Sequence, residues 1–200
     1  MQFKESIVFK ISDDFKISVS LMHPLDSTDM FDDTEFFLEH NREKLSIYAN
    51  DLIIFGLESF CSYIGIAIAN EIPLHESIKE DIGYMWNKDL HATAEGYKTK
   101  LVMEKGEKTD YWVGQKYLLW SSPGTTTWLY NKGDRIFLHV TPTYKWNFDS
   151  PEKGETFISY KDYMKAYKPY YIINIKKNVA QKLLKKVETL IKIIRDNSAD

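Results

Sequence analysis

The side chains best able to do chemistry are five histidines and one cysteine, spread widely over 200 residues. The histidines are His23, His40, His75, His91 and His139. None has a second ligand at the spacing of a metal site, and His75-Glu76 lacks the second histidine that a helical zinc motif requires. We therefore expect a structural role for each histidine, with no metal and no cofactor.

Cys61 is the one thiol, and it lies in a strongly apolar segment. A single cysteine cannot form an internal disulfide. A nucleophilic thiol needs a nearby base and access to solvent, which an apolar helix does not offer. We expect Cys61 to be a buried small hydrophobe. The N-terminal sequence has no signal-peptide pattern, so we also expect a reducing, cytoplasmic environment.

Other catalytic signatures are missing from the sequence. It contains no phosphate-binding P-loop and no G-x-S-x-G elbow. Paired carboxylates occur, as at Asp32-Asp33, but hydrolytic pairs are defined by their separation in space. We therefore predict no catalytic residue. The alternative is a small hydrolase or ligand-binding protein with an aromatic-lined cleft, in which His139 or a carboxylate transfers protons. Its lining would be Trp112, Trp120, Trp128 and Trp146.

The segment Asp26–Glu39 holds six carboxylates, no lysine and no arginine. Its acidic residues alternate with phenylalanines, and carboxylates around apolar anchors suit the capture of a basic protein surface. The alternative is an acidic loop whose rings enter the core. The predicted partner-binding residues are Asp26, Asp29, Phe31, Asp32, Asp33, Glu35, Phe36 and Glu39.

Charge is distributed unevenly along the chain. Residues 1–100 carry 9 Lys and Arg against 18 Asp and Glu, a net charge of −9, while residues 101–200 carry 17 against 11, a net charge of +6. Such polarity steers association with a charged partner, unless the two surfaces neutralise each other. The lysine-rich C-terminal segment is a candidate for phosphate contacts. An overall charge of −3 and the lack of interleaved aromatic residues there argue against nucleic-acid binding.

Periodicity predicts the elements that position these residues. Alternating patterns indicate strands, and three- and four-residue steps indicate helices. The predicted strands are Ser6–Ser12, Phe15–Met22, Tyr97–Met103, Tyr111–Trp120, Thr126–Tyr130, Arg135–Thr141 and Tyr170–Ile175. The predicted helices are Arg42–Ala69, Leu74–Asn87, Ser159–Tyr167 and Asn178–Arg195.

The apolar run Leu52–Ala69 raises the question of a membrane span. It has 18 residues, and Glu58 near its middle would be costly in hydrocarbon, so we favour a buried central helix. The whole chain, residues 1–200, is expected to form one α+β domain. We expect an antiparallel sheet of about five to seven strands packed against this long helix and a C-terminal helix.

The turn near Gly133 leaves two arrangements of the aromatic hairpin open. A three-residue loop, Asn131-Lys132-Gly133, needs positive φ only at glycine and places Trp128 on a core face with Ile136. A two-residue loop at Lys132-Gly133 instead groups Trp128 with Phe137 and His139 on one amphipathic face. Turn chemistry favours the first arrangement.

These observations predict a non-enzymatic, cytoplasmic protein-binding module with a basic protein as its partner. Small acidic immunity proteins, which neutralise basic nuclease toxins in bacteria by occluding the toxin's active surface, share this general character. The likeness is one of type, because no motif in the chain marks such a family.

Overall fold

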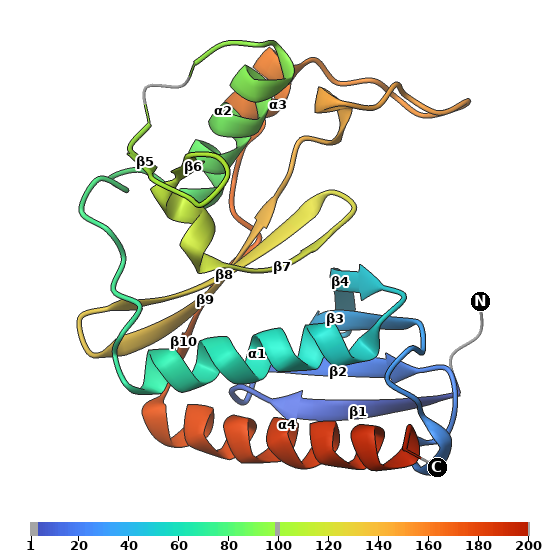
Figure 1. The fold of residues 1–200 in the computed structure, drawn as a ribbon. Helices are drawn as coiled ribbons and strands as arrows, with labels where there is room; N and C mark the ends of the chain where they lie inside the picture. Colours follow the sequence, from blue (N-terminus) through green and yellow to red (C-terminus); the bar gives the residue numbers. More distant parts are fainter. Residues whose placement is uncertain (1–3, 99–100, 200) are drawn as a thin grey trace.

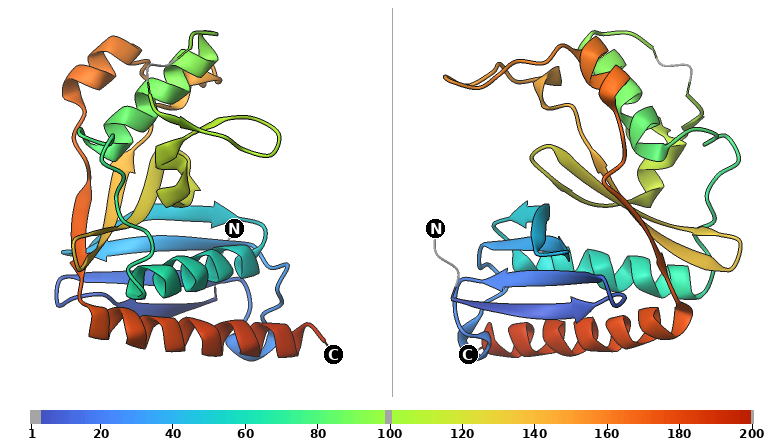
Figure 2. Two further views of the ribbon diagram at one scale, coloured as in Figure 1. Left: turned by 60° about the vertical axis from the view of Figure 1, so that its left-hand side comes forward. Right: turned by 180° about the vertical axis from the view of Figure 1, so that it is seen from behind.

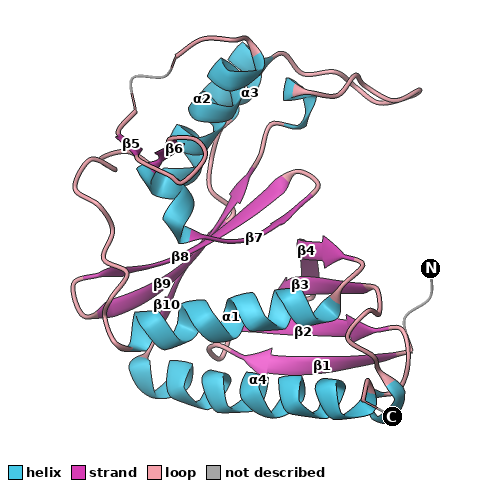
Figure 3. Cartoon of the chain, in the orientation of Figure 1, coloured by secondary structure: helices cyan, strands magenta, loops and turns pink. Residues whose placement is uncertain are grey.

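The computed structural model describes residues 4–98 and 101–199. The fold is α+β, as predicted, with four α-helices among the described residues (Figure 1). Its strands form two four-stranded antiparallel sheets and one two-stranded pair, in place of the single sheet of five to seven strands that the sequence suggested (Figure 3). Both four-stranded sheets contribute to one continuous apolar core.

The first sheet is built from the first four strands in their chain order. They are β1 (Glu5–Lys10), β2 (Phe15–Leu21), β3 (Thr34–His40) and β4 (Glu43–Asn50). Helices α1 (Ile53–Ile68) and α4 (Lys177–Asn197) lie side by side on one face of this sheet, and in the described part of the chain no helix covers its other face (Figure 2). At the outer edge, the Val8 carbonyl accepts a hydrogen bond from Lys186 Nζ at 3.3 Å.

The predicted helix from Arg42 to Ala69 is wrong over its first part, which is strand β4. Leu45 and Tyr48 are three residues apart and pair with the inward-facing residues Leu38 and Phe36. A β-bulge inserts Ile47 between them, so that two strand residues three apart face the core together. This spacing imitates helical periodicity.

The second sheet has the order β10-β9-β8-β7. Its strands are β7 (Leu118–Ser122), β8 (Thr125–Lys132), β9 (Arg135–Pro142) and β10 (Tyr171–Ile175). Pairing of Lys132 with Arg135 leaves Gly133-Asp134 as a two-residue turn. Only Gly133 of these two has a positive φ, +62°, which fits a type II′ turn. The preferred three-residue loop is therefore wrong.

The observed register puts Trp128 opposite His139 and Tyr130 opposite Phe137. These four residues share a face, as the rejected alternative grouped them, but the face is internal. Trp128 is fully buried, and Tyr130 and His139 are nearly so. The hairpin is consequently part of the core and offers no open aromatic platform.

A smaller layer of helices and turns lies beyond the second sheet (Figure 1). Its main elements are η2 (Val113–Tyr117), α2 (Ile82–Ala94), α3 (Tyr160–Ala166), η3 (Lys145–Asn147) and the short pair β5 (Met103–Glu104) with β6 (Tyr111–Trp112). The predicted helix Leu74–Asn87 starts too early, because the side chain of Asp81 caps α2 by accepting the Tyr84 amide at 3.1 Å. Of the predicted strand Tyr97–Met103, residues 99–100 lie outside the described part.

Helix α1 joins the two sheets. Its apolar side packs against α4, β4, β7 and β8, and the indole Nε1 of Trp120 on β7 donates to the Gly56 carbonyl at 3.0 Å. Phe36, Tyr48 and Phe60 surround that indole. Within the described residues, we find no helix with the length and apolar character needed to cross a bilayer.

Candidate functional site

The acidic loop, residues 22–33, connects β2 to β3 and contains the short helix η1 (Leu25–Ser27). Its own carboxylates set its shape. Asp32 Oδ2 accepts the amide of Asp29 at 3.1 Å, and Asp29 Oδ1 accepts the amide of Phe31 at 2.7 Å. His23 Nε2 lies 3.7 Å from Asp32 Oδ1. The side chains of Asp26 and Asp33 make no hydrogen bond within residues 4–98 and 101–199, so their oxygens can contact a partner.

The end of α4 and the start of α1 hold this loop in place. Asn197 Nδ2 donates to two loop carbonyls, those of Leu25 at 2.8 Å and Thr28 at 3.0 Å. Ser198 Oγ accepts the amide of Met30 at 3.0 Å. The carbonyl of Asp32 accepts the first amide of α1. An ordered loop loses less conformational entropy on binding than a disordered one.

Phe31 lies in the turn at residues 29–32 of the acidic loop and is 66% exposed. Its sequence neighbours Asp29, Asp32 and Asp33 are acidic, and exposed aromatic rings of this kind are enriched at the centres of protein–protein interfaces. A depression of about 450 Å³ beside Asp26, lined also by Glu5, lies at the same end of the molecule.

The remaining predicted residues divide between the two faces of β3. Phe36 is fully buried under Trp120, so its assignment to the partner-binding surface is wrong. Glu35 and Glu39 project from the opposite face, and Glu39 lies at the far end of the strand from the acidic loop. The hydroxyl of Ser18 and the ammonium of Lys44, 2.9 Å away, hold the pKa of Glu39 below its usual value.

Phe37 was not among the predicted partner-binding residues. Phe37 pairs with Ser18 and lies on the helix-free face with Glu35, where it is half-buried. The strict inside–outside alternation of β3 would have separated Phe37 from Phe36 had the segment been recognised as a strand.

A second candidate is the polar network around His139. Nε2 of His139 lies 3.0 Å from Oδ2 of Asp81, and Nδ1 lies 3.2 Å from the hydroxyl of Tyr130. The hydroxyl of Tyr167 donates to the other oxygen of Asp81. This network joins β8, β9, the start of α2 and the segment after α3.

The surroundings of this network shift the pKa values of its carboxylate and its phenols. Burial opposes ionisation of Asp81, but His139 and Tyr167 outweigh it and hold the pKa of Asp81 below its ordinary value. Burial, reinforced by Asp81, raises the pKa of Tyr130 to about 12. A groove of about 480 Å³ borders Tyr167, but neither His139 nor Asp81 lines it. The network therefore fastens α2 to β9, and its histidine is only 2% exposed.

The predicted aromatic cleft does not form. Trp112, Trp120 and Trp128 are buried at 0 to 2% exposure and fill the core. Trp128 Nε1 donates to Thr141 Oγ1 at 3.0 Å, which satisfies the indole internally. Trp146 instead lines a groove at the surface.

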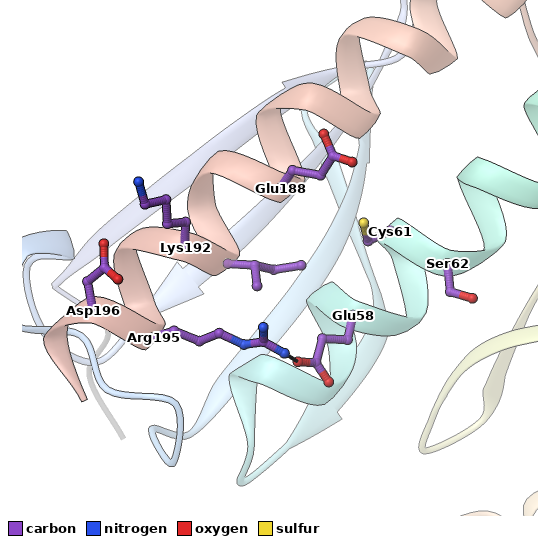
Figure 4. Close-up of a pocket in the computed structure, with 8 residues that line it drawn as sticks. Glu58, Cys61, Ser62, Glu188, Lys192, Arg195 and Asp196 are labelled. Carbon is purple, nitrogen blue, oxygen red and sulfur yellow. Dashed lines mark hydrogen bonds and ion pairs between the residues drawn. The ribbon is translucent and has the colours of Figure 1, made fainter. Parts of the chain in front are cut away.

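A groove of about 620 Å³ lies between α1 and α4. Figure 4 shows the side chains that line it. Arg195 pairs with Glu58 at 2.5 Å across it, and Cys61 projects into it. Burial raises the pKa of the Cys61 thiol, and Glu188 and Glu58 raise it further. A thiol held protonated between two carboxylates lacks nucleophilic character. Cys61 is half-buried, so the expected full burial of this side chain is not met.

No cluster of three or more histidine, cysteine or carboxylate side chains positioned to hold a metal occurs among the described residues. Comparisons with protein-family models, with curated proteins and with solved structures found no match.

Proposed function

We propose that this protein is a non-enzymatic protein-binding module that attaches to a basic partner through the acidic loop. The observation that carries the proposal is the exposed ring of Phe31, in an acidic loop that Asn197 and Ser198 hold in shape. The carboxylates accelerate encounter with a positive surface, and the ring provides the apolar contact that keeps the partner bound.

The mode of action would be occlusion, as in immunity-type proteins that neutralise a basic toxin. A toxin that cleaves nucleic acid binds phosphates with lysine and arginine side chains. The side chains of Asp26, Asp33 and Glu35 would occupy the positions of those phosphates. Such contacts are screened by salt, so affinity should fall as ionic strength rises.

A small hydrolase is the second candidate, and the His139–Asp81 pair is the observation in its favour. A histidine held by a carboxylate is the arrangement of a general base. Its burial at 2% exposure and the absence of either residue from the adjacent groove argue against this role. We therefore give priority to protein binding.

Capture of basic proteins from the source organism at low and high salt tests the proposal. The immobilised protein should retain a basic protein at low salt and release it at high salt. Phe31→Ala and the double variant Asp26→Asn/Asp33→Asn should each weaken retention about tenfold or more, since hot-spot truncation costs about 2 kcal/mol. Tyr97→Ala is the matched control, because Tyr97 is equally exposed but lies after α2. Equal retention by all variants would overturn the proposal.

A further inference from the structure

A surface groove of about 590 Å³ lies between the β7–β8 turn, α2 and residues 143–155. Figure 1 shows that the chain beyond η3 extends here as an arm away from the second sheet. Aromatic and acidic side chains line the groove: Tyr144, Trp146, Phe148, Asp149, Glu152 and Glu155. With Lys145, the charged groups of the lining total one positive and three negative, a net charge of −2.

The groove already contains one cation next to an aromatic ring. Lys145 Nζ lies 5.1 Å from the centroid of the Trp146 ring and pairs with Glu155. Glu155 also accepts the indole Nε1 of Trp146 at 3.3 Å and the amide of Glu152 at 3.2 Å. Glu155 is thus fully engaged, and its contacts fix the position of the Trp146 ring.

The floor of the groove is rigid. Tyr144 is buried at 5% exposure, and its amide donates to Asn87 Oδ1 at 2.7 Å. Asn147 bonds His91 through its side chain at 3.0 Å, and His91 is stacked on Tyr160 at 3.5 Å between ring centroids. A fixed floor under a concave surface is typical of a binding site whose shape exists before the ligand arrives.

The remaining groups of the lining are available to a ligand. Phe148 is 68% exposed, which is costly for a large ring without a partner. Asp149 and Glu152 are exposed, and their side chains make no hydrogen bond or ion pair in the portion of the chain that is described. The groove therefore offers one open aromatic face beside two unpaired carboxylates.

We propose that this groove binds the side chain of an arginine presented by another polypeptide. A guanidinium group is planar, stacks on aromatic rings and bonds carboxylates in bidentate fashion. It would stack on Phe148 and donate to Asp149 or Glu152, repeating the cation–aromatic–carboxylate contact that Lys145 makes with Trp146 and Glu155. The net charge of −2 disfavours an anionic ligand. This site is separate from the acidic loop and does not depend on it.

Titration with short blocked peptides tests the proposal. The probes are Gly-Arg-Gly and its citrulline analogue, which keeps the shape of arginine without the charge, followed by NMR of the Trp146 indole. We expect the arginine peptide to bind about tenfold more tightly than the citrulline peptide, as charge-assisted hydrogen bonds predict. Equal binding of the two peptides, or shifts confined to other parts of the molecule, would overturn the proposal.

Variants separate this site from the acidic loop. Phe148→Ala and Asp149→Asn/Glu152→Gln should each lower affinity for the arginine peptide about tenfold. Asp134→Asn, a matched exposed carboxylate in the β8–β9 turn, should leave affinity within about twofold. Asp26→Asn/Asp33→Asn should also leave it unchanged. If the acidic-loop variant abolishes peptide binding while the groove variants do not, the groove proposal fails and that of the acidic loop stands.

Discussion

His139 and Asp81 lie in direct contact, with Nε2 of the imidazole 3.0 Å from Oδ2 of the carboxylate. The two residues come from β9 and from the cap of α2, so the contact ties the helical layer to the second sheet. Gly83 makes this approach possible, because a Cβ there would lie within 2.5 Å of both Thr141 and the Tyr167 hydroxyl. The contact is structural, and its main consequence is for stability.

Asp81→Asn should lower the free energy of unfolding by about 2 kcal/mol at pH 7, since it removes a partly buried carboxylate charge that accepts the Tyr167 hydroxyl while keeping the cap. The pKa of Asp81 is depressed in the folded state, so its stabilisation is present above the unfolded value of 3.8 and is lost as pH falls below it. Urea titrations from pH 3 to 7 should show the gap between the two proteins closing at acid pH. A gap that stayed constant would contradict this account.

Asn197→Ala should loosen the acidic loop. It removes the two hydrogen bonds to Leu25 and Thr28 and should cost about 1 to 2 kcal/mol. Hydrogen exchange of the loop amides should accelerate. Asn178→Ala, at the exposed start of the same helix, serves as the control and should change neither quantity. Unchanged exchange in Asn197→Ala would show that α4 does not hold the loop.

Gly65→Ala and Gly133→Ala should have opposite effects, although neither added Cβ meets an atom within 4 Å. Gly65 lies inside α1, where alanine favours the helix by about 0.5 to 1 kcal/mol. Gly133 has a φ of +62°, where alanine costs about 1 to 2 kcal/mol. Thermal unfolding of the two variants against the parent protein measures both. A stabilised Gly133→Ala protein would refute the observed turn.

Cys61 should react slowly with iodoacetamide at neutral pH. Burial and the neighbouring carboxylates raise its pKa, so the pH at which alkylation reaches half its maximum rate should lie above that of free cysteine. Glu188→Gln should move this midpoint down by removing one of the charges that raise the pKa. Rapid alkylation of the parent protein at pH 7 would contradict the inferred surroundings of the thiol.

Elements with simple patterns were predictable from the sequence. Strands β1, β2 and β10 and helices α3 and α4 were found within a few residues of their bounds. Strand β4 was missed because the bulge at Ile47 disrupts its alternation. The start of α2 was predicted too early, although Asp81, whose side chain accepts the Tyr84 amide, is a residue type favoured at the N-cap of a helix.

Among the candidate site residues, those adjacent in the sequence were also easier to predict than those brought together by the fold. Asp26, Asp29, Phe31, Asp32 and Asp33 are neighbours in the chain and remain neighbours in the loop, so composition alone indicated them. Contacts between distant residues, such as those of Asp81 with His139 and Tyr167, follow from the pairing of whole elements. The burial of Phe36 could be predicted only with the strand register of the first sheet in hand.

The Lys186 ammonium on the Val8 carbonyl limits how this protein can assemble. The outermost strand of a sheet is a template for recruiting a strand from another molecule. A strand from another molecule that paired with this edge would have to displace the Lys186 ammonium from the Val8 carbonyl. Fibre-like polymerisation through this border is thereby discouraged.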